Sequence, residues 1–228
     1  MFKIGIGILS LSVFFAACED PAVNKPKAQT TTSSTNTATN LAASSPVTTS
    51  VNATTSTMET KGTALPISPE NSTVEFTGSK VTGKHDGGFK SFKGTIDLVN
   101  NKPEESRVSV DIDANSIFTD DEKLTGHLKS ADFFDVAKFP NANFTSTKIV
   151  PDAERGAGNY TVTGDFGLHG QKKSITFPAK ITMSDAEVAV DTEFSINRKD
   201  FGIVYAGKTD DLIRDDVVIR LNLKSSRK

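Results

Sequence analysis

Hydrophobic and polar residues alternate along most of the chain from Pro66 onward. A period of two places apolar side chains on one face of a β-strand and polar side chains on the other. Val108, Val110 and Ile112, for example, are separated by single polar residues. The same pattern predicts about eight strands, which contain the segments 74–76, 92–98, 108–112, 143–150, 160–168, 175–183, 188–196 and 217–223.

One segment departs from this alternation and predicts a helix. Thr119 and Glu122 fit a capping box, in which Thr119 is the N-cap and the Glu122 side chain reaches back to it. Leu124 and Leu128 follow four residues apart, so they share one helical face. We therefore expect a short helix from about residue 120 to 131, lying over one end of the sheet.

Long alternating strands joined by turn-rich segments favour antiparallel pairing, and closure into a barrel would leave no exposed sheet edge. The predicted fold is all-β: an extended antiparallel barrel of about eight strands with one short helix. Such a barrel either fills its interior with side chains or holds one small ligand. The chain has 15 Phe, two Tyr and no Trp, and rings without hydrogen-bonding groups suit a dry interior in both cases. The candidate inward-facing residues are Phe76, Phe92, Ile96, Val110, Ile112, Phe166, Leu168, Phe177, Phe194 and Ile196.

Charge and motifs argue against several classes of function. The formal net charge is −2, which offers no basic excess for nucleic-acid binding. The chain has no Gly-x-Ser-x-Gly motif, phosphate-binding loop or dinucleotide fingerprint, so we expect neither catalysis nor a cofactor. His85, His127 and His169 lack the short spacing of metal ligands, and no metal site is expected.

The start of the chain is typical of a secretory signal peptide. Lys3 precedes an apolar run from Ile4 to Phe15, and two alanines lead to Cys18, the single cysteine. The run is shorter than the roughly 20 residues that span a bilayer. The segment resembles a bacterial lipobox, with Phe15 where Leu is more usual. That resemblance implies cleavage before Cys18, acylation of its thiol and anchoring to a membrane; an ordinary secreted protein is the alternative.

A long uncharged segment follows this signal. Between Thr30 and Thr57 most positions are Ser or Thr, and nothing bulky or periodic is present to bury. We predict a signal peptide over residues 1–17, a lipidated cysteine with a flexible tether over residues 18–65, and a barrel domain over residues 66–228. A tether of about 45 residues would reach roughly 35–40 Å and hold the barrel clear of the membrane.

Four stretches of the barrel domain resemble a known family. They are Val81-Thr82-Gly83-Lys84-His85 with Gly87, Gly88, Phe89 and Gly94; LTGHLKSADFFDVAKFPNANF from Leu124 to Phe144; YTVTGDFGLHGQKKSITFPAKI from Tyr160 to Ile181; and Arg198, Phe201, Gly202, Ile203 and Tyr205, followed by DDLIRDD over 210–216. In this order they are similar to the YceI-like family of lipid- or polyisoprenoid-binding proteins. The resemblance covers nearly all of residues 66–228. It implies an exported, lipocalin-like barrel whose hydrophobic tunnel holds a long isoprenoid chain.

A lipid head group at the end of such a tunnel would need a cation or a hydrogen-bond donor. Lys80 has the same parity as Phe76, and Arg198 has the same parity as Ile196. An inward cation without a partner is costly, so each needs an anion, a ligand or water. A bulge that turns them outward, or pairing with nearby Asp residues, is the open alternative. The remaining candidates for head-group contact are His85 and Tyr205.

These features together predict a non-catalytic protein of the bacterial cell envelope, lipid-anchored on a periplasmic or outer-membrane face, that carries or stores a long-chain isoprenoid or similar lipid. Burying one five-carbon unit contributes roughly 3–4 kcal/mol gross, and association costs about 4–15 kcal/mol. Burial of a few five-carbon units would therefore offset the cost of association. The alternative is a filled barrel that contacts another envelope protein. A continuous apolar cavity favours the first hypothesis, and native packing density throughout favours the second.

Overall fold

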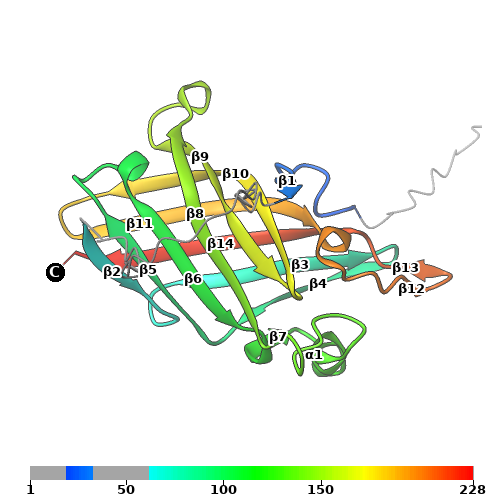
Figure 1. The fold of residues 1–228 in the computed structure, drawn as a ribbon. Helices are drawn as coiled ribbons and strands as arrows, with labels where there is room; N and C mark the ends of the chain where they lie inside the picture. Colours follow the sequence, from blue (N-terminus) through cyan, green and yellow to red (C-terminus); the bar gives the residue numbers. More distant parts are fainter. Residues whose placement is uncertain (1–18, 33–61, 228) are drawn as a thin grey trace, which may run out of the picture.

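A computed structural model describes residues 19–32 and 62–227, which form a mostly β protein with one α-helix (Figure 1). The strands are β1 (Gln29–Thr32), β2 (Thr63–Ile67), β3 (Thr73–Lys80), β4 (Gly83–Phe89), β5 (Phe92–Leu98), β6 (Arg107–Asp113), β7 (Ile117–Thr119), β8 (Asn141–Pro151), β9 (Asn159–Leu168), β10 (Gln171–Met183), β11 (Glu187–Asn197), β12 (Gly207–Lys208), β13 (Asp211–Leu212) and β14 (Asp216–Ser226). The helices are α1 (Glu122–Lys129) and the 3₁₀ turns η1 (Pro103–Glu105), η2 (Ala114–Ser116), η3 (Ala153–Arg155) and η4 (Arg198–Phe201).

Twelve strands form a single curled sheet that wraps around the core (Figure 1). Eleven follow the order β2-β5-β6-β8-β9-β10-β11-β14-β3-β4-β7, while β1 pairs with β10 off this path. Every strand pair is antiparallel. The predicted lipocalin-like antiparallel architecture is confirmed, but the predicted count of about eight strands is too low. The predicted segments became β3, β5, β6, β8, β9, β10, β11 and β14.

The strands that sequence analysis missed are short or lack alternation. β4 reads GKHDGGF, a composition that predicts a loop, yet its backbone pairs with β3 over six residue pairs. Gly87 is required there, because a Cβ atom would lie 2.4 Å from the Phe118 carbonyl oxygen and 2.6 Å from Phe76 Cζ. The glycine therefore allows β7 to approach β4 and pair with it.

Helix α1 confirms the predicted helix, but the predicted N-cap is wrong. Asp121 caps the helix, since its Oδ1 accepts a hydrogen bond from the Leu124 amide at 2.9 Å. That bond lowers the pKa of Asp121. Thr119 instead belongs to β7, where pairing with Gly87 holds it extended, and its hydroxyl donates to the Asp121 carbonyl at 2.7 Å. The helix ends at Lys129, two residues earlier than predicted.

The core is one contiguous cluster built from the inward faces of the sheet and from α1. Its most deeply buried apolar side chains include Phe201, Ile67, Ile117 and Ile175. In the described ranges 19–32 and 62–227, no helix has the length and apolar character needed to cross a membrane.

The N-terminal segment 19–32 forms part of the barrel wall. Strands β10 and β11 pair directly only where Lys180–Met183 of β10 meet Val188–Asp191 of β11. Beyond this stretch the two strands separate, and the N-terminal segment lies between them. On one side β1 pairs with β10. On the other, the Ala28 amide donates to the Ser195 carbonyl, and the Ser195 amide donates to the Pro26 carbonyl, both at 2.8 Å.

The prediction of a flexible tether is therefore wrong for residues 19–32 and for residues 63–65, which begin β2. Alternation did not indicate this strand, because it satisfies backbone donors and acceptors of β10 and β11, a role that needs no apolar periodicity. The signal peptide predicted over 1–17, Cys18 and the tether over 33–61 lie outside the described residues.

We expect Ala28→Pro to weaken the wall between β10 and β11, because proline has no amide hydrogen to donate to Ser195. The free energy of unfolding should fall by about 1–3 kcal/mol, measured by urea denaturation. Amide exchange at Ser195 should also accelerate. Ala28→Gly retains the donor and serves as the control. Equal effects of the two substitutions on Ser195 exchange would show that this hydrogen bond does not hold the segment in place.

Candidate functional site

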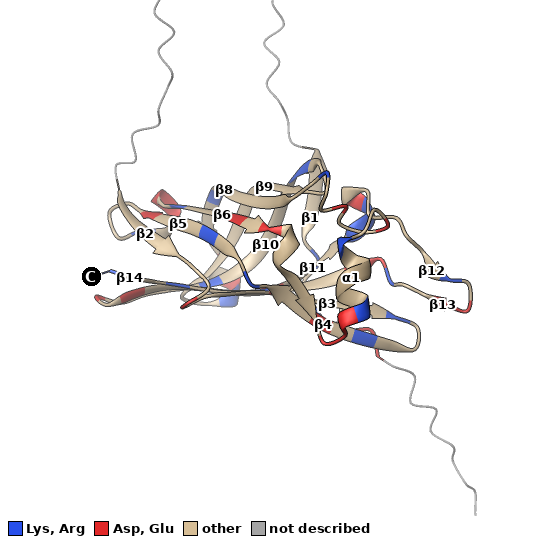
Figure 2. Cartoon of the chain, turned by 90° about the horizontal axis from the view of Figure 1, so that it is seen from below, with Lys and Arg blue, Asp and Glu red and all other residues tan. Residues whose placement is uncertain are grey.

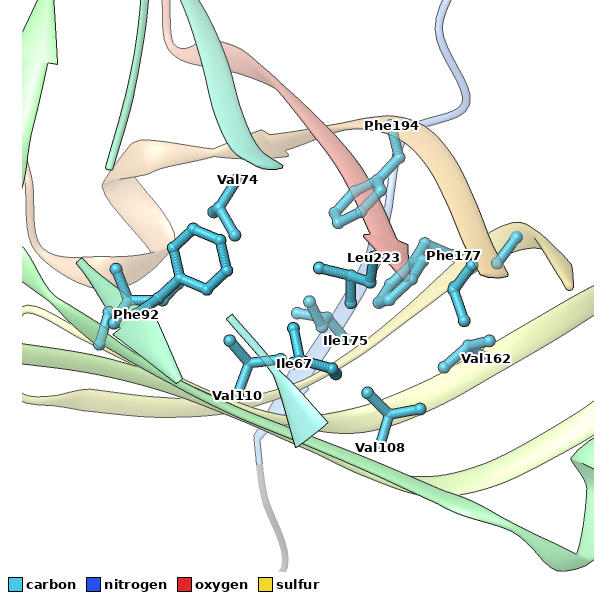
Figure 3. Packing of buried hydrophobic residues seen from close by; sticks show 14 of the residues in the cluster. Ile67, Val74, Phe92, Val108, Val110, Val162, Ile175, Phe177, Phe194 and Leu223 are labelled. Atoms are coloured by element: carbon cyan, nitrogen blue, oxygen red, sulfur yellow. The ribbon is translucent and has the colours of Figure 1, made fainter. Parts of the chain in front are cut away.

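The curled sheet encloses a cavity of about 370 Å³. This volume falls within the range of roughly 300–1,000 Å³ that is usual for small-molecule pockets. Figure 3 shows Val108, Val110 and Val162 on one side of the interior, opposite Phe194 and Val74. The barrel is therefore hollow, and apolar side chains from several strands line the space.

Most of the predicted inward residues line this cavity: Phe76, Val110, Ile112, Phe166, Leu168, Phe177, Phe194 and Ile196. Phe92 and Ile96 do not, although both are buried. They lie on β5, whose edge neighbour in the sheet is the missed strand β2, and Leu65 of β2 pairs in register with Ile96. Both side chains belong to the packed core cluster, so the expectation that Phe92 and Ile96 line the cavity is corrected.

Aromatic rings cover much of the wall. Phe177 and Phe194 come from the neighbouring strands β10 and β11 and stack with centroids 4.2 Å apart and planes 10° apart. Phe144 packs against Phe177 at 5.6 Å. Its ring occupies the space left by Gly164, where a Cβ atom would lie 2.4 Å from Phe144 Cζ. The rings therefore lie along the wall, and their apolar faces suit contact with a hydrocarbon chain.

Helix α1 and the turn after it contribute lining residues that sequence reasoning missed. Leu124, Leu128, Phe133 and Phe134 all line the cavity at one end. The spacing of Leu124 and Leu128 had predicted an apolar helical face. That face needs burial against another element, and the barrel end offers the apolar surface for it. This signal predicts that α1 packs on the barrel, but it does not show that the packed face lines a cavity.

Four of the polar lining residues contact either Asp120, just before α1, or the segment 211–215, and we call them the polar end of the cavity: Ser79, Lys80, His85 and Arg198. Glu75 and Thr192 also line the cavity. Lys80 forms an ion pair with Asp211. This pair, together with hydrogen bonds from the hydroxyl and amide of Thr82, lowers the pKa of the Asp211 carboxyl. Pairing with a nearby aspartate, one of the alternatives left open by the sequence, is therefore what the structure shows for Lys80.

Arg198 lies at the start of η4 and is only 4% exposed. Its Nε donates to the Arg214 carbonyl at 3.1 Å and its Nη1 to the Ile203 carbonyl at 2.7 Å. Its Nη2 bonds to the Ile213 carbonyl and to Asp215 Oδ1. Burial lowers the pKa of Arg198, and the Asp215 charge opposes that effect. An arginine has five N–H groups, so one remains without a protein partner in the described part of the chain.

The other candidates at this end differ in their relation to the cavity. His85 lines it, and its Nδ1 lies 2.8 Å from Asp120 Oδ1. Tyr205 does not line it; its ring packs behind Phe133 with centroids 5.3 Å apart. Ser79, which the sequence did not single out, has a buried hydroxyl with no hydrogen-bond partner among the described residues. The geometry thus brings Lys80, His85 and Arg198 together and sets Tyr205 one layer back.

The three histidines have separate partners. His85 contacts Asp120, His127 contacts Asp132, and His169 contacts the Phe201 carbonyl. Within residues 19–32 and 62–227, no group of three or more His, Cys, Asp or Glu side chains is arranged to hold a metal ion.

Residues 65–225 match the YceI-like domain. Among curated relatives, the UPF0312 protein PputW619_0484 of Pseudomonas putida (strain W619) is 34% identical over 139 residues, which cover 58% of this chain and 71% of the relative. The UPF0312 protein of Pseudomonas fluorescens (strain SBW25) is 33% identical over 137 residues, covering 58% of this chain and 70% of the relative.

Solved structures share the fold at lower identity. BcnA of Burkholderia cenocepacia superposes with a TM-score of 0.63 at 22% identity, covering 70% of this chain and 99% of BcnA. A polyisoprenoid binding domain from Saccharophagus degradans superposes with a TM-score of 0.57 at 18% identity, covering 72% of this chain and 99% of that domain. Because the domain match extends over residues 65–225, the chain belongs to the YceI-like domain family.

Proposed function

We propose that this protein binds a long-chain isoprenoid or a similar lipid in its cavity and carries or stores it in the bacterial cell envelope. The observation that carries the proposal is the hollow, ring-lined interior of about 370 Å³. The polyisoprenoid binding domain from Saccharophagus degradans has the same fold, which supports this choice of ligand class. The filled barrel required by the alternative of a protein-interaction module does not agree with that cavity.

The lining supports binding driven by apolar contact. Burial of each five-carbon unit contributes roughly 3–4 kcal/mol gross, so a few units offset an association cost of about 4–15 kcal/mol. The two cations at the polar end already have aspartate partners. A head group could therefore hydrogen-bond to the remaining Arg198 N–H and to the Ser79 hydroxyl, and it would not need to form an ion pair. This arrangement favours a neutral or weakly polar head group and a non-catalytic role.

The proposed location follows from the N-terminal sequence. A signal peptide over residues 1–17 would direct export, and acylation of Cys18 would attach the mature chain to a membrane on the periplasmic or outer-membrane face. Intact mass spectrometry of the chain expressed with its own signal tests this point. A mature chain that begins at Cys18 and carries acyl groups is expected, and a Cys18→Ala variant should lack that modification.

The ligand is tested by native mass spectrometry and lipid extraction of the full chain purified in mild detergent. One equivalent of a long-chain lipid should co-purify, and the delipidated protein should take up the long prenyl alcohol solanesol. A protein that neither co-purifies with long-chain lipid nor takes up solanesol would contradict the proposal.

A further inference from the structure

We propose that the polar end of the cavity faces the membrane directly, because the N-terminal segment fixes the barrel against the bilayer at that end. The inference rests on the proposed function in one respect, since it takes Cys18 as an acylated anchor. It replaces the expectation of a barrel held clear of the membrane by a tether. The partner is a lipid bilayer, and the contacting surface is a set of exposed apolar side chains, the apolar tips: Val23, Val81, Val204 and Leu212.

Ion pairs hold the segment that follows the anchor against the barrel. Asp20 pairs with Arg214 at 3.2 Å, and farther along the segment Lys25 pairs with Glu193 at 2.6 Å and Lys27 with Asp216 at 2.7 Å. The backbone ladder with β10 and Ser195 adds to these contacts. Cys18 precedes Asp20 by two residues, a distance of at most about 7 Å along the chain. An acyl group on Cys18 would therefore enter the membrane close to Arg214.

Arg214 lies beside the polar end of the cavity. Its amide donates to the Ser79 carbonyl at 2.9 Å, and its carbonyl accepts from Arg198 Nε at 3.1 Å. The preceding residue, Ile213, lines the cavity. The anchor and the polar end therefore lie at the same end of the barrel.

The apolar tips are largely exposed to solvent. Val81, Val204, Leu212 and Val23 are 53%, 64%, 49% and 67% exposed. Val81 and Leu212 are neighbours, since the Val81 amide donates to the Leu212 carbonyl at 3.2 Å. Val204 lies two residues before Ala206, whose carbonyl accepts from the Ile213 amide. Figure 1 shows the β12–β13 ribbon projecting beyond the barrel at the end where α1 lies. Exposed aliphatic side chains gathered around the anchor suit insertion among lipid head groups.

The surface at this end of the barrel carries charges of both signs. Figure 2 shows Lys and Arg interspersed with Asp and Glu over α1, the β3–β4 hairpin and the β12–β13 ribbon. Lys80 of β3 and Asp211 of β13 are paired with each other, and nearby Lys199 of η4 is paired with Asp215. A surface of mixed sign gives no preference for anionic lipids, so apolar insertion supplies the contact. Such insertion is weak alone, but an attached acyl chain provides the second signal that stable membrane contact requires.

The test uses the full acylated chain in phosphatidylcholine vesicles that contain a bromine-labelled lipid as a quencher. Acylation occupies Cys18, the natural cysteine, so Val204→Cys and Leu212→Cys each supply one thiol for an environment-sensitive fluorophore. Val150→Cys is the matched control, because Val150 is also an exposed aliphatic residue, 39% exposed, at the end of β8 remote from α1. Quenching at 204 and 212 should exceed quenching at 150 several-fold and should be unchanged when phosphatidylglycerol is added.

Adding Ala28→Pro to Val204→Cys tests the cause of the orientation. Release of the N-terminal segment should lower quenching at 204 toward the level at 150. Similar quenching at all three positions would overturn the inference. Efficient disulfide formation between unlabelled Val204→Cys chains on vesicles exposed to a mild oxidant, together with no excess quenching of the labelled chains, would also overturn it, because a second copy would then cover the apolar tips.

The same samples separate this inference from the proposed function. Intact mass reports acylation of Cys18, and extraction reports lipid in the cavity. An acylated, lipid-loaded protein with uniform quenching would refute the orientation and leave the proposed function standing. A chain without acylation or without cavity lipid would count against the proposed function itself.

Discussion

Phe166→Asp is expected to abolish retention of lipid by the cavity. Phe166 lies on β9, lines the cavity and packs edge-on against Phe201 with centroids 5.1 Å apart. Ionised aspartate at this position would place a charge beside an apolar chain, and an unpaired charge in such surroundings is strongly unfavourable. A loss of about 3 kcal/mol, roughly a hundredfold in affinity, is a conservative expectation. Lipid extracted per mole of protein, together with titration by solanesol, measures it.

Two further variants show whether the cavity itself is responsible. Lys224→Asp changes charge on β14 at a residue outside the cavity lining, and it should leave uptake unchanged. Ala142→Phe adds a ring to the wall of β8 without adding charge. It should reduce the length of the chain retained while the barrel stays folded by circular dichroism. Equal uptake by Phe166→Asp and Lys224→Asp would contradict the assignment of Phe166 to the binding wall.

Alternation predicted the walls of the cavity well because burial on one face of a strand imposes it. On β9, Val162, Phe166 and Leu168 share one parity, and all three line the cavity. The pattern could not separate lining from filled core, since both need apolar side chains. Ile96 has the same parity signal, yet it belongs to the packed core cluster and does not line the cavity. That distinction depends on where the interior stays open, a property of the whole fold.

The segments that escaped prediction are held mainly by backbone hydrogen bonds. β1 reads QTTT, a sequence with no apolar periodicity, and it completes the wall between β10 and β11. β4 depends on the absence of a side chain at Gly87. Parity also brought Lys80 and Arg198 to the cavity but gave no information on their partners. Asp211 and Asp215 come from a later part of the chain, and only the fold brings them together.

Replacing Arg198 with methionine should lower the free energy of unfolding by about 3–5 kcal/mol, because three backbone carbonyls lose their donor and each buried unsatisfied acceptor costs roughly 1–3 kcal/mol. The guanidinium is almost fully buried and bonds to three backbone carbonyls in addition to Asp215. Methionine fills similar space but leaves those carbonyls, including that of Ile203, without a donor. The segment 203–215 that closes the polar end should then loosen. Urea denaturation of the delipidated protein measures the change.

Lys199 provides a control from the next position in the chain. Its Nζ lies 2.9 Å from Asp215 Oδ2, so it shares the carboxylate with Arg198, but its side chain is 47% exposed. An exposed ion pair contributes about 0–1 kcal/mol, and Lys199→Met should therefore change stability by no more than this. Unchanged stability of the lipid-free Arg198→Met variant would show that Arg198 is not structural and would return it to the role of a head-group contact. A large loss in Arg198→Met alone would establish that the buried guanidinium, rather than the exposed Lys199 charge, holds the polar end of the cavity together.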